Sequence, residues 1–148
     1  MTIYLLYGQP ASGKTTLSKL LCKHIEHKVG GCDPAIIDGD EFRELLANKD
    51  YSKKGRYQNI RNANAIATYI NNVEHRDVIM ALVNPYKCLR AELKINNSQV
   101  REIMLTSNRA LKKEYHVKDF EMGNPDYIID TDQKIEDSWN QLKGLLKI

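Results

Sequence analysis

Short apolar runs recur along the chain, and each is too brief for a helix of ordinary length. Their hydrophobicity is continuous and does not alternate with polar positions, which is typical of strands buried on both faces of a sheet. There are five such runs: Ile3 to Tyr7, Ala35 to Ile37, Asp77 to Val83, Glu102 to Leu105 and Tyr127 to Ile129. We therefore expect five strands.

Helical spacing of apolar residues fills the segments between several of these runs. Residues three or four positions apart share one face of a helix. The spacing predicts one face from Leu17, Leu20, Leu21 and Ile25, a second from Ala63, Ile66, Ala67, Ile70 and Val73, and a third from Ile135, Trp139, Leu142 and Leu146. The alternation of strands and helices indicates an α/β fold with three α/β/α layers and a mostly parallel five-stranded sheet, with ligands bound at the carboxyl ends of its strands.

Composition adds limits to this expected fold. The 148 residues are 42% apolar and 28% charged, enough for one domain with its own core, so we expect residues 1–148 to form a single domain. The net charge of +3 is spread along the chain, so we do not expect nucleic acid as a partner.

Location and cysteine chemistry follow from the same inspection. No run approaches the roughly 20 apolar residues of a membrane span and no secretion leader is readable, so we expect no membrane contact and a cytoplasmic location. Cys22, Cys32 and Cys88 are odd in number and form no CxxC pair, which argues against a disulfide framework or a zinc site.

The segment GQPASGKTT supplies the first candidate chemistry. Residues 8–15 fit the pattern GxxxxGK[ST], between a predicted strand and a predicted helix. Backbone N–H groups in this context curve around phosphate oxygens at the positive end of a helix. Lys14 can reach the β- and γ-phosphates of ATP, and the Thr15 hydroxyl can coordinate Mg²⁺. We therefore predict ATP binding by Gly8, Gln9, Pro10, Ala11, Ser12, Gly13, Lys14, Thr15 and Thr16, in a fold like that of P-loop nucleoside-triphosphate hydrolases.

The segment AIIDGDEFR ends the second predicted strand with two carboxylates. In extended chain a spacing of two points Asp38 and Asp40 to the same side, toward the phosphate loop. One carboxylate can bind the metal and the other can remove a proton from an acceptor hydroxyl. We assign Asp38 to the metal and Asp40 to the proton, the reverse assignment staying open, with Lys14 as the third catalytic residue. Asp-Gly-Asp is also a good turn and helix cap, which is the alternative interpretation.

Two absent signals separate the classes of protein that bind nucleotides in this way. The third predicted strand ends in VNP with no acidic residue, where a motor ATPase carries a metal-binding carboxylate, and no NKxD-type guanine-reading motif is present. These features favour a compact ATP-dependent kinase. A kinase for polynucleotide ends or another metabolite, and a non-catalytic nucleotide-binding module, stay open.

Several segments together resemble the adenylylsulfate (APS) kinases, which transfer the γ-phosphate of ATP to the 3′-hydroxyl of adenosine 5′-phosphosulfate. They are GQPASGKTTLSKLL, IDGDEFRELL, YSKKGRYQNIRNANAIA, VIMALVNPYKCLRAEL and FEMGNPDYIIDT, in the order such kinases show. The resemblance implies that Arg43, Arg56 and Asn59 line the acceptor pocket with Asp40, and that Tyr51 lies beside the base. A guanidinium suits sulfate or phosphate oxygens, and an aromatic ring can stack on a base.

The chain departs from that family at two places. Val83 and Asn84 stand where the family has an apolar residue and a serine, so we include both in the acceptor pocket, with altered contacts at Asn84. Residues 106–120 replace a longer lid, with Arg109, Lys112 and Lys113 expected on a short helix and Arg109 as the arginine over ATP. The acceptor is then APS, a related nucleotide or another small hydroxyl compound, and a homodimer stays open.

Overall fold

The computed structural model describes residues 1–26, 32–109 and 113–148, and its centre is one five-stranded sheet. The strands are β1 (Ile3–Tyr7), β2 (Ala35–Asp38), β3 (Val78–Leu82), β4 (Val100–Thr106) and β5 (Tyr127–Asp130). Their order in the sheet is β2-β3-β1-β4-β5, and every pairing is parallel. The five predicted strands are confirmed, and so is the three-layer α/β class.

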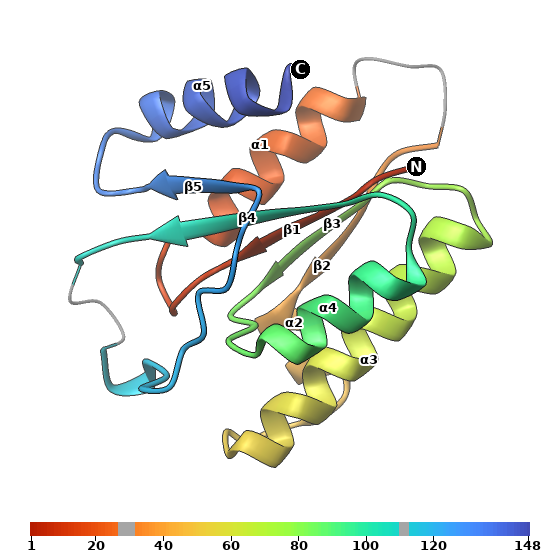
Figure 1. Ribbon diagram of the computed structural model, residues 1–148, viewed down its shortest axis with the longest axis vertical. Helices are drawn as coiled ribbons and strands as arrows, with labels where there is room; N and C mark the ends of the chain where they lie inside the picture. The colour runs from red at the N-terminus through yellow and green to blue at the C-terminus, as the bar shows by residue number, and fades with distance from the viewer. Residues whose placement is uncertain (27–31, 110–112) are drawn as a thin grey trace.

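Helices cover both faces of the sheet (Figure 1), and the described residues form five α-helices. They are α1 (Lys14–Glu26), α2 (Gly39–Leu45), α3 (Lys53–Asn72), α4 (Lys87–Asn96) and α5 (Ile135–Leu146), with a short 3₁₀ helix, η1, at Lys113–Tyr115. One core cluster joins the sheet to α1 and α5, and another joins its opposite face to α2, α3 and α4. No helix in the described part of the chain is both long and apolar enough to cross a bilayer.

The continuous hydrophobicity of the strands has a direct structural reason. In β1, Ile3, Leu5 and Tyr7 face the cluster under α3, while Leu6 faces the cluster under α1 and α5. All five residues of β3 are buried. A strand with helices on both faces needs apolar side chains at odd and even positions alike.

Two residues of the helical face predicted on α3 are exposed. Ile66 is 41% exposed and Val73, the C-cap of α3, is 58% exposed. The buried face includes Asn59, Asn64 and Asn71. Because these side chains are polar, a prediction based on apolar residues alone does not assign them to the buried face. At about 100° per residue, Ile66 lies roughly 100° or more around the helix from Asn64, Ala67 and Asn71. Those parts of the predicted face were wrong.

Two other helical predictions also need correction. Ile135, at the start of α5, is 45% exposed. Arg109 lies outside any helix, so it is not on the expected short helix, whereas Lys113 is the first residue of η1. Lys112 lies outside the described residues.

Candidate functional site

The phosphate loop connects β1 to α1 across residues 8–13, and two glycines permit its path. A Cβ on Gly8 would collide with the carbonyl oxygen of Leu105 on β4. Gly13 has a φ of 89°, which side chains of L-residues rarely adopt. The loop therefore packs closely against the sheet and delivers Lys14 as the first residue of α1.

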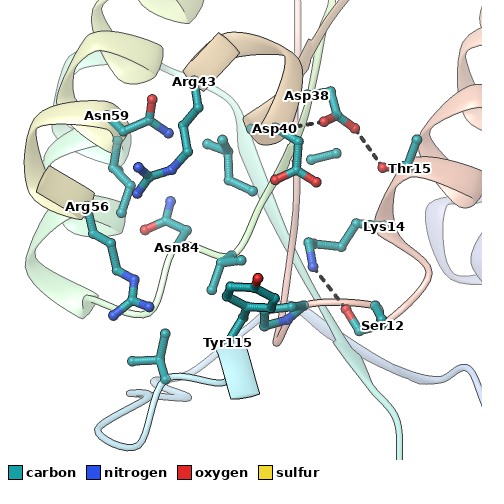
Figure 2. A pocket seen from close by; sticks show the side chains of 18 of the residues that line it. Ser12, Lys14, Thr15, Asp38, Asp40, Arg43, Arg56, Asn59, Asn84 and Tyr115 are labelled. Atoms are coloured by element: carbon teal, nitrogen blue, oxygen red, sulfur yellow. Dashed lines mark hydrogen bonds between the residues drawn. The ribbon is translucent and has the colours of Figure 1, made fainter. Parts of the chain in front are cut away.

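Lys14 is nearly buried, and its ammonium is bonded to the loop itself. Its Nζ donates to the carbonyl oxygens of Gly8 and Gln9 at 3.1 and 2.7 Å and to Ser12 Oγ at 3.2 Å. Figure 2 shows the last of these bonds. The ammonium is thus held at the centre of the loop, where phosphate oxygens, being charged, would be stronger acceptors than the carbonyls.

The two carboxylates meet the loop in different ways. Asp38 ends β2 and accepts a 2.6 Å hydrogen bond from Thr15 Oγ1 through Oδ2. Its other oxygen, Oδ1, accepts from the backbone N–H groups of Asp40 and Glu41 and caps the amino end of α2. Asp38 therefore makes the helix cap of the alternative interpretation and also touches the predicted metal ligand Thr15.

Asp40 reaches the same cavity for a reason other than the one expected. It lies in the first turn of α2, not in extended chain, so the spacing argument for its direction was wrong. Both carboxylates nevertheless line one cavity with Lys14 and Thr15 (Figure 2). Gly39 lies between them, and a Cβ there would come within 2.8 Å of Leu82 Cδ2 on β3, so the end of the Leu82 side chain would have to shift.

One cavity of about 900 Å³ unites the predicted residues at the carboxyl ends of the strands. That volume is sufficient for a nucleotide-sized ligand. Its wall contains all of the predicted site residues except Gly8 and Gln9: Pro10, Ala11, Ser12, Gly13, Lys14, Thr15, Thr16, Asp38, Asp40, Arg43, Tyr51, Arg56, Asn59, Val83, Asn84 and Arg109. The side chain of Gln9 is bonded instead to the main chain of Val117.

The half of the cavity opposite the phosphate loop holds the two arginines that were predicted to bind the acceptor. Arg43, on α2, donates to the carbonyl oxygens of Asn48 and Asp50 at 3.2 and 2.9 Å and lies 4.3 Å from the centre of the Tyr51 ring. Burial lowers the pKa of the Arg43 guanidinium, which stays cationic at neutral pH. Arg56 and Asn59 come from α3 and face the same space (Figure 2).

Asn84 is the least satisfied polar side chain of this half. It is 1% exposed, and neither Nδ2 nor Oδ1 has a hydrogen-bond partner in the described part of the chain. Its φ of 42° is left-handed, a conformation that asparagine tolerates better than most residues. The backbone is fixed there by the buried Arg90, whose Nη1 donates to the Asn84 carbonyl oxygen at 2.7 Å. Oδ1 of Asn59 is also buried without a partner.

The structure adds cavity residues that the sequence did not suggest. Tyr115 of η1 and Val117 line the main cavity, and the Tyr115 ring lies 6.3 Å from that of Tyr51. They come from the segment expected to be a lid, but no local motif distinguished them. Only their contacts with residues distant in the sequence identify them as cavity residues.

A smaller cavity of about 120 Å³ adjoins the phosphate loop on the side of β5. Arg109 Nη2 donates to Thr131 Oγ1 at 3.2 Å, and that hydroxyl donates to the carbonyl oxygen of Ser12 at 2.8 Å. Thr131 follows β5 directly, so its place at the carboxyl end of a strand was the available signal. The lining residues are Gly13, Thr16, Leu17, Arg109, Thr131, Gln133, Ile135 and Ser138.

Metal ligation in this site depends on few protein groups. Within the described ranges, no group of three or more histidine, cysteine or acidic side chains is arranged to hold an ion. The oxygens of Thr15 and Asp38 are hard donors of the kind that Mg²⁺ prefers, and this ion commonly takes its remaining ligands from water and phosphate. The donor set therefore fits magnesium held together with a nucleotide.

Comparisons with solved structures agree with this architecture. The Mycobacterium tuberculosis APS kinase CysC in complex with AMPPNP and APS is 20% identical, with a TM-score of 0.79 over 99% of this chain and 98% of that one. The hexameric APS kinase from Thiobacillus denitrificans is 21% identical, with a TM-score of 0.75 over 99% of this chain and 29% of that one. A gluconokinase from Sinorhizobium meliloti 1021 is 10% identical, with a TM-score of 0.69 over 99% and 92%. At these identities the likeness establishes the P-loop kinase fold.

Sequence comparison identifies the family. The search of curated proteins finds no significant match. A family model described as "Adenylylsulphate kinase" matches residues 1–119, which include the phosphate loop, both carboxylates and the predicted acceptor residues. The chain therefore belongs to the adenylylsulphate kinase family, whose members are ATP-dependent kinases.

Proposed function

We propose that this chain transfers the γ-phosphate of ATP to a hydroxyl group, and that the acceptor is the 3′-hydroxyl of adenosine 5′-phosphosulfate or of a closely related nucleotide. The observation that carries the proposal is the shared cavity. It has a phosphate loop on one wall, Asp40 beside it, and Arg43 and Arg56 on the far wall. A donor phosphate and an anionic acceptor have complementary groups to bind within one cavity.

The donor half supports ATP as the phosphate source. The backbone N–H groups at the start of α1 and the Lys14 ammonium would bind the β- and γ-phosphates. The smaller cavity beside Arg109 and Thr131 is our proposed binding site for the adenine, with the Arg109 guanidinium stacked on the base. Magnesium would be held by Thr15, with Asp38 binding its water shell, and would offset negative charge on the phosphate oxygens.

The acceptor half supports a phosphosulfate. Arg43 and Arg56 would bind the anionic oxygens, and Asn59 would hydrogen-bond to the sugar or base. Tyr51, with Tyr115 opposite it, offers an aromatic surface for a base. Asp40 would accept the proton of the attacking hydroxyl, while Lys14 stabilises the charge that develops on the transferred phosphoryl group.

The test is phosphoryl transfer from γ-labelled ATP across an acceptor panel. It contains APS, nucleotides with a free 3′-hydroxyl, DNA with 5′-hydroxyl ends, and sugar acids. We expect the highest kcat/KM with APS or a 3′-hydroxyl nucleotide. Transfer to DNA ends or sugar acids alone would contradict the acceptor assignment, and ATP binding without any transfer would favour a non-catalytic module.

A kinase for another small hydroxyl compound is the second candidate, and Asn84 favours it. A carboxamide has both a donor and an acceptor, so it can bind a group that the serine usual in this family does not. Because both Asn84 groups are buried without partners, they would gain more from a complementary ligand than exposed groups would. The same panel separates the two candidates.

Location and assembly are parts of the proposal with their own tests. A kinase that uses ATP and a soluble nucleotide would work in the cytoplasm, which cell fractionation checks. A homodimer is compatible with the cavity, because one chain supplies every wall residue named above. Light scattering at working concentration measures the number of chains.

A further inference from the structure

The Gln9 side chain makes a two-point pair with the main chain of a distant residue. Its Nε2 donates to the Val117 carbonyl oxygen at 2.8 Å, and its Oε1 accepts from the Val117 N–H at 2.9 Å. The two residues are 108 positions apart. A primary carboxamide has a donor and an acceptor side by side, so it satisfies both backbone groups of Val117 as a neighbouring strand would.

Val117 belongs to a segment that forms part of the cavity wall. Tyr115 and Val117 both line the cavity, and Val117 is 4% exposed. Among the described residues, the two bonds to Gln9 are the only hydrogen bonds that join residues 113–119 to the rest of the chain. The segment therefore depends on one side chain for its polar attachment.

The residues that follow are attached quite differently. Arg90 Nη2 donates to the carbonyl oxygens of Glu121 and Met122 at 2.6 and 3.1 Å, and Tyr7 Oη donates to Met122 at 2.7 Å. Burial raises the pKa of Tyr7 to about 12, so its hydroxyl remains a donor at neutral pH. None of these bonds involves Gln9. Loss of the Gln9 side chain should therefore leave residues 120–122 in place.

Gln9 also contacts the residue that faces the phosphates. Its carbonyl oxygen accepts a 2.7 Å hydrogen bond from Lys14 Nζ. Gln9 thus contacts Lys14, the proposed phosphate-binding lysine, through its main chain and an adjoining part of the cavity wall through its side chain. The contact joins the loop to Tyr115, whose ring neighbours Tyr51 on the acceptor side.

We infer that Gln9 is a positioning residue, which fixes residues 113–119 against the phosphate loop and so builds the acceptor-side wall that carries Tyr115 and Val117. This role differs from the predicted role of Gln9 as an ATP ligand, because the Gln9 side chain is not part of the cavity wall. The kinetic arm of the test below rests on the proposed function. The exchange arm does not.

Hydrogen exchange tests the attachment directly, on the full chain without ligands. In Gln9→Met, which keeps the length of the side chain but has no amide, we expect amide exchange in residues 113–119 to accelerate about tenfold or more, since two hydrogen bonds are lost. Residues 120–122 should be unchanged. Gln9→Glu keeps the acceptor for the Val117 N–H and loses only the donor, so its exchange should be intermediate. Unchanged exchange in both variants would overturn the inference.

Kinetics then distinguish a positioning residue from an ATP ligand. With whichever acceptor the panel identifies, Gln9→Met should raise the acceptor KM about tenfold and leave the Kd of a fluorescent ATP analogue within about twofold. The matched control is Gln99→Met, an exposed glutamine before β4 whose side chain accepts a hydrogen bond from Thr2 Oγ1. A loss of ATP affinity with an unchanged acceptor KM would overturn the inference. Failure of the wild type on every acceptor would refute the proposed function while the exchange result stands.

Discussion

The two halves of the cavity are built in opposite ways. The phosphate half is built on one contiguous segment, of which residues 10–16 line the cavity. Its charged group is bonded within that segment, since Lys14 donates to Gly8, Gln9 and Ser12. The acceptor half is assembled from α2, α3, the end of β3 and the segment after β4. It contains buried amide atoms of Asn59 and Asn84 that lack partners in the described chain.

This difference matches two tasks: binding a triphosphate, which all P-loop kinases share, and selecting an acceptor, which differs among them. A triphosphate is the same ligand in every P-loop kinase, so a short local motif suffices to bind it. The acceptor differs from one kinase to another, and its side of the cavity has unpaired donors and acceptors that a ligand must complement. The following variants test the comparison, beginning with the largest expected effect.

Lys14→Ala should have the largest effect on transfer. Removal of the ammonium leaves charge on the transferring phosphoryl group without its partner, so we expect kcat to fall by at least about a hundredfold. Lys19→Ala, an exposed lysine on the same helix, is the control. Circular dichroism should show both variants folded. A folded Lys14→Ala variant with a near-normal kcat would show that the loop lysine is not needed for catalysis.

Asp40→Asn tests the proposed base. The amide keeps the size of the side chain but accepts no proton, and we expect kcat to fall by at least about a hundredfold with little change in ATP affinity. Glu41→Gln is the matched control, since its side chain is exposed and does not line the cavity. An equal loss in both variants would point to damage in α2 and not to proton transfer.

Arg56→Met should act on the acceptor alone. Loss of one charge-assisted contact to an anionic acceptor should raise the acceptor KM about tenfold and leave the Kd for ATP unchanged. Arg61→Met, on the same helix with a 59% exposed side chain, controls for the loss of one positive charge. Equal KM values in the two variants would remove Arg56 from the acceptor site.

Asn84→Ser should have the smallest effect, and it is visible as a change in selectivity. Serine is the residue usual in this family at this position, and a hydroxyl cannot replace both groups of a carboxamide. We expect the ratio of kcat/KM values between APS and the best alternative acceptor to shift about threefold to tenfold toward APS. The control is Asn72→Ser, whose side chain bonds to Asn96 on the surface. An unchanged ratio would mean that Asn84 does not read the acceptor.

Features encoded locally could be predicted from the sequence. The strands follow from continuous apolar runs, and the phosphate loop follows from glycine and lysine spacing between a strand and a helix. The face of α3 was partly misassigned because asparagines occupy buried positions on it. Asp40 was placed in the correct cavity for a wrong geometric reason, since the chain turns into α2 at Gly39.

Features that depend on long-range packing could not be predicted. The pairing of Gln9 with Val117 joins residues 108 positions apart, and nothing near either residue in the sequence indicates it. The approach of Tyr115 to Tyr51 has the same origin. Gln9 follows β1 and Val117 follows β4, and these two strands pair in the folded sheet. Tyr51 lies between α2 and α3, so its approach to Tyr115 depends on the packing of further elements.

A crystal structure of the chain with Mg²⁺, a non-hydrolysable ATP analogue and the best acceptor would test the central claim most directly. Our account predicts the triphosphate on the N–H groups of residues 8–16, with the attacking hydroxyl within hydrogen-bonding distance of the Asp40 carboxylate and in line with the γ-phosphorus. An acceptor bound with its hydroxyl beyond the reach of Asp40, or a triphosphate bound away from this loop, would contradict it.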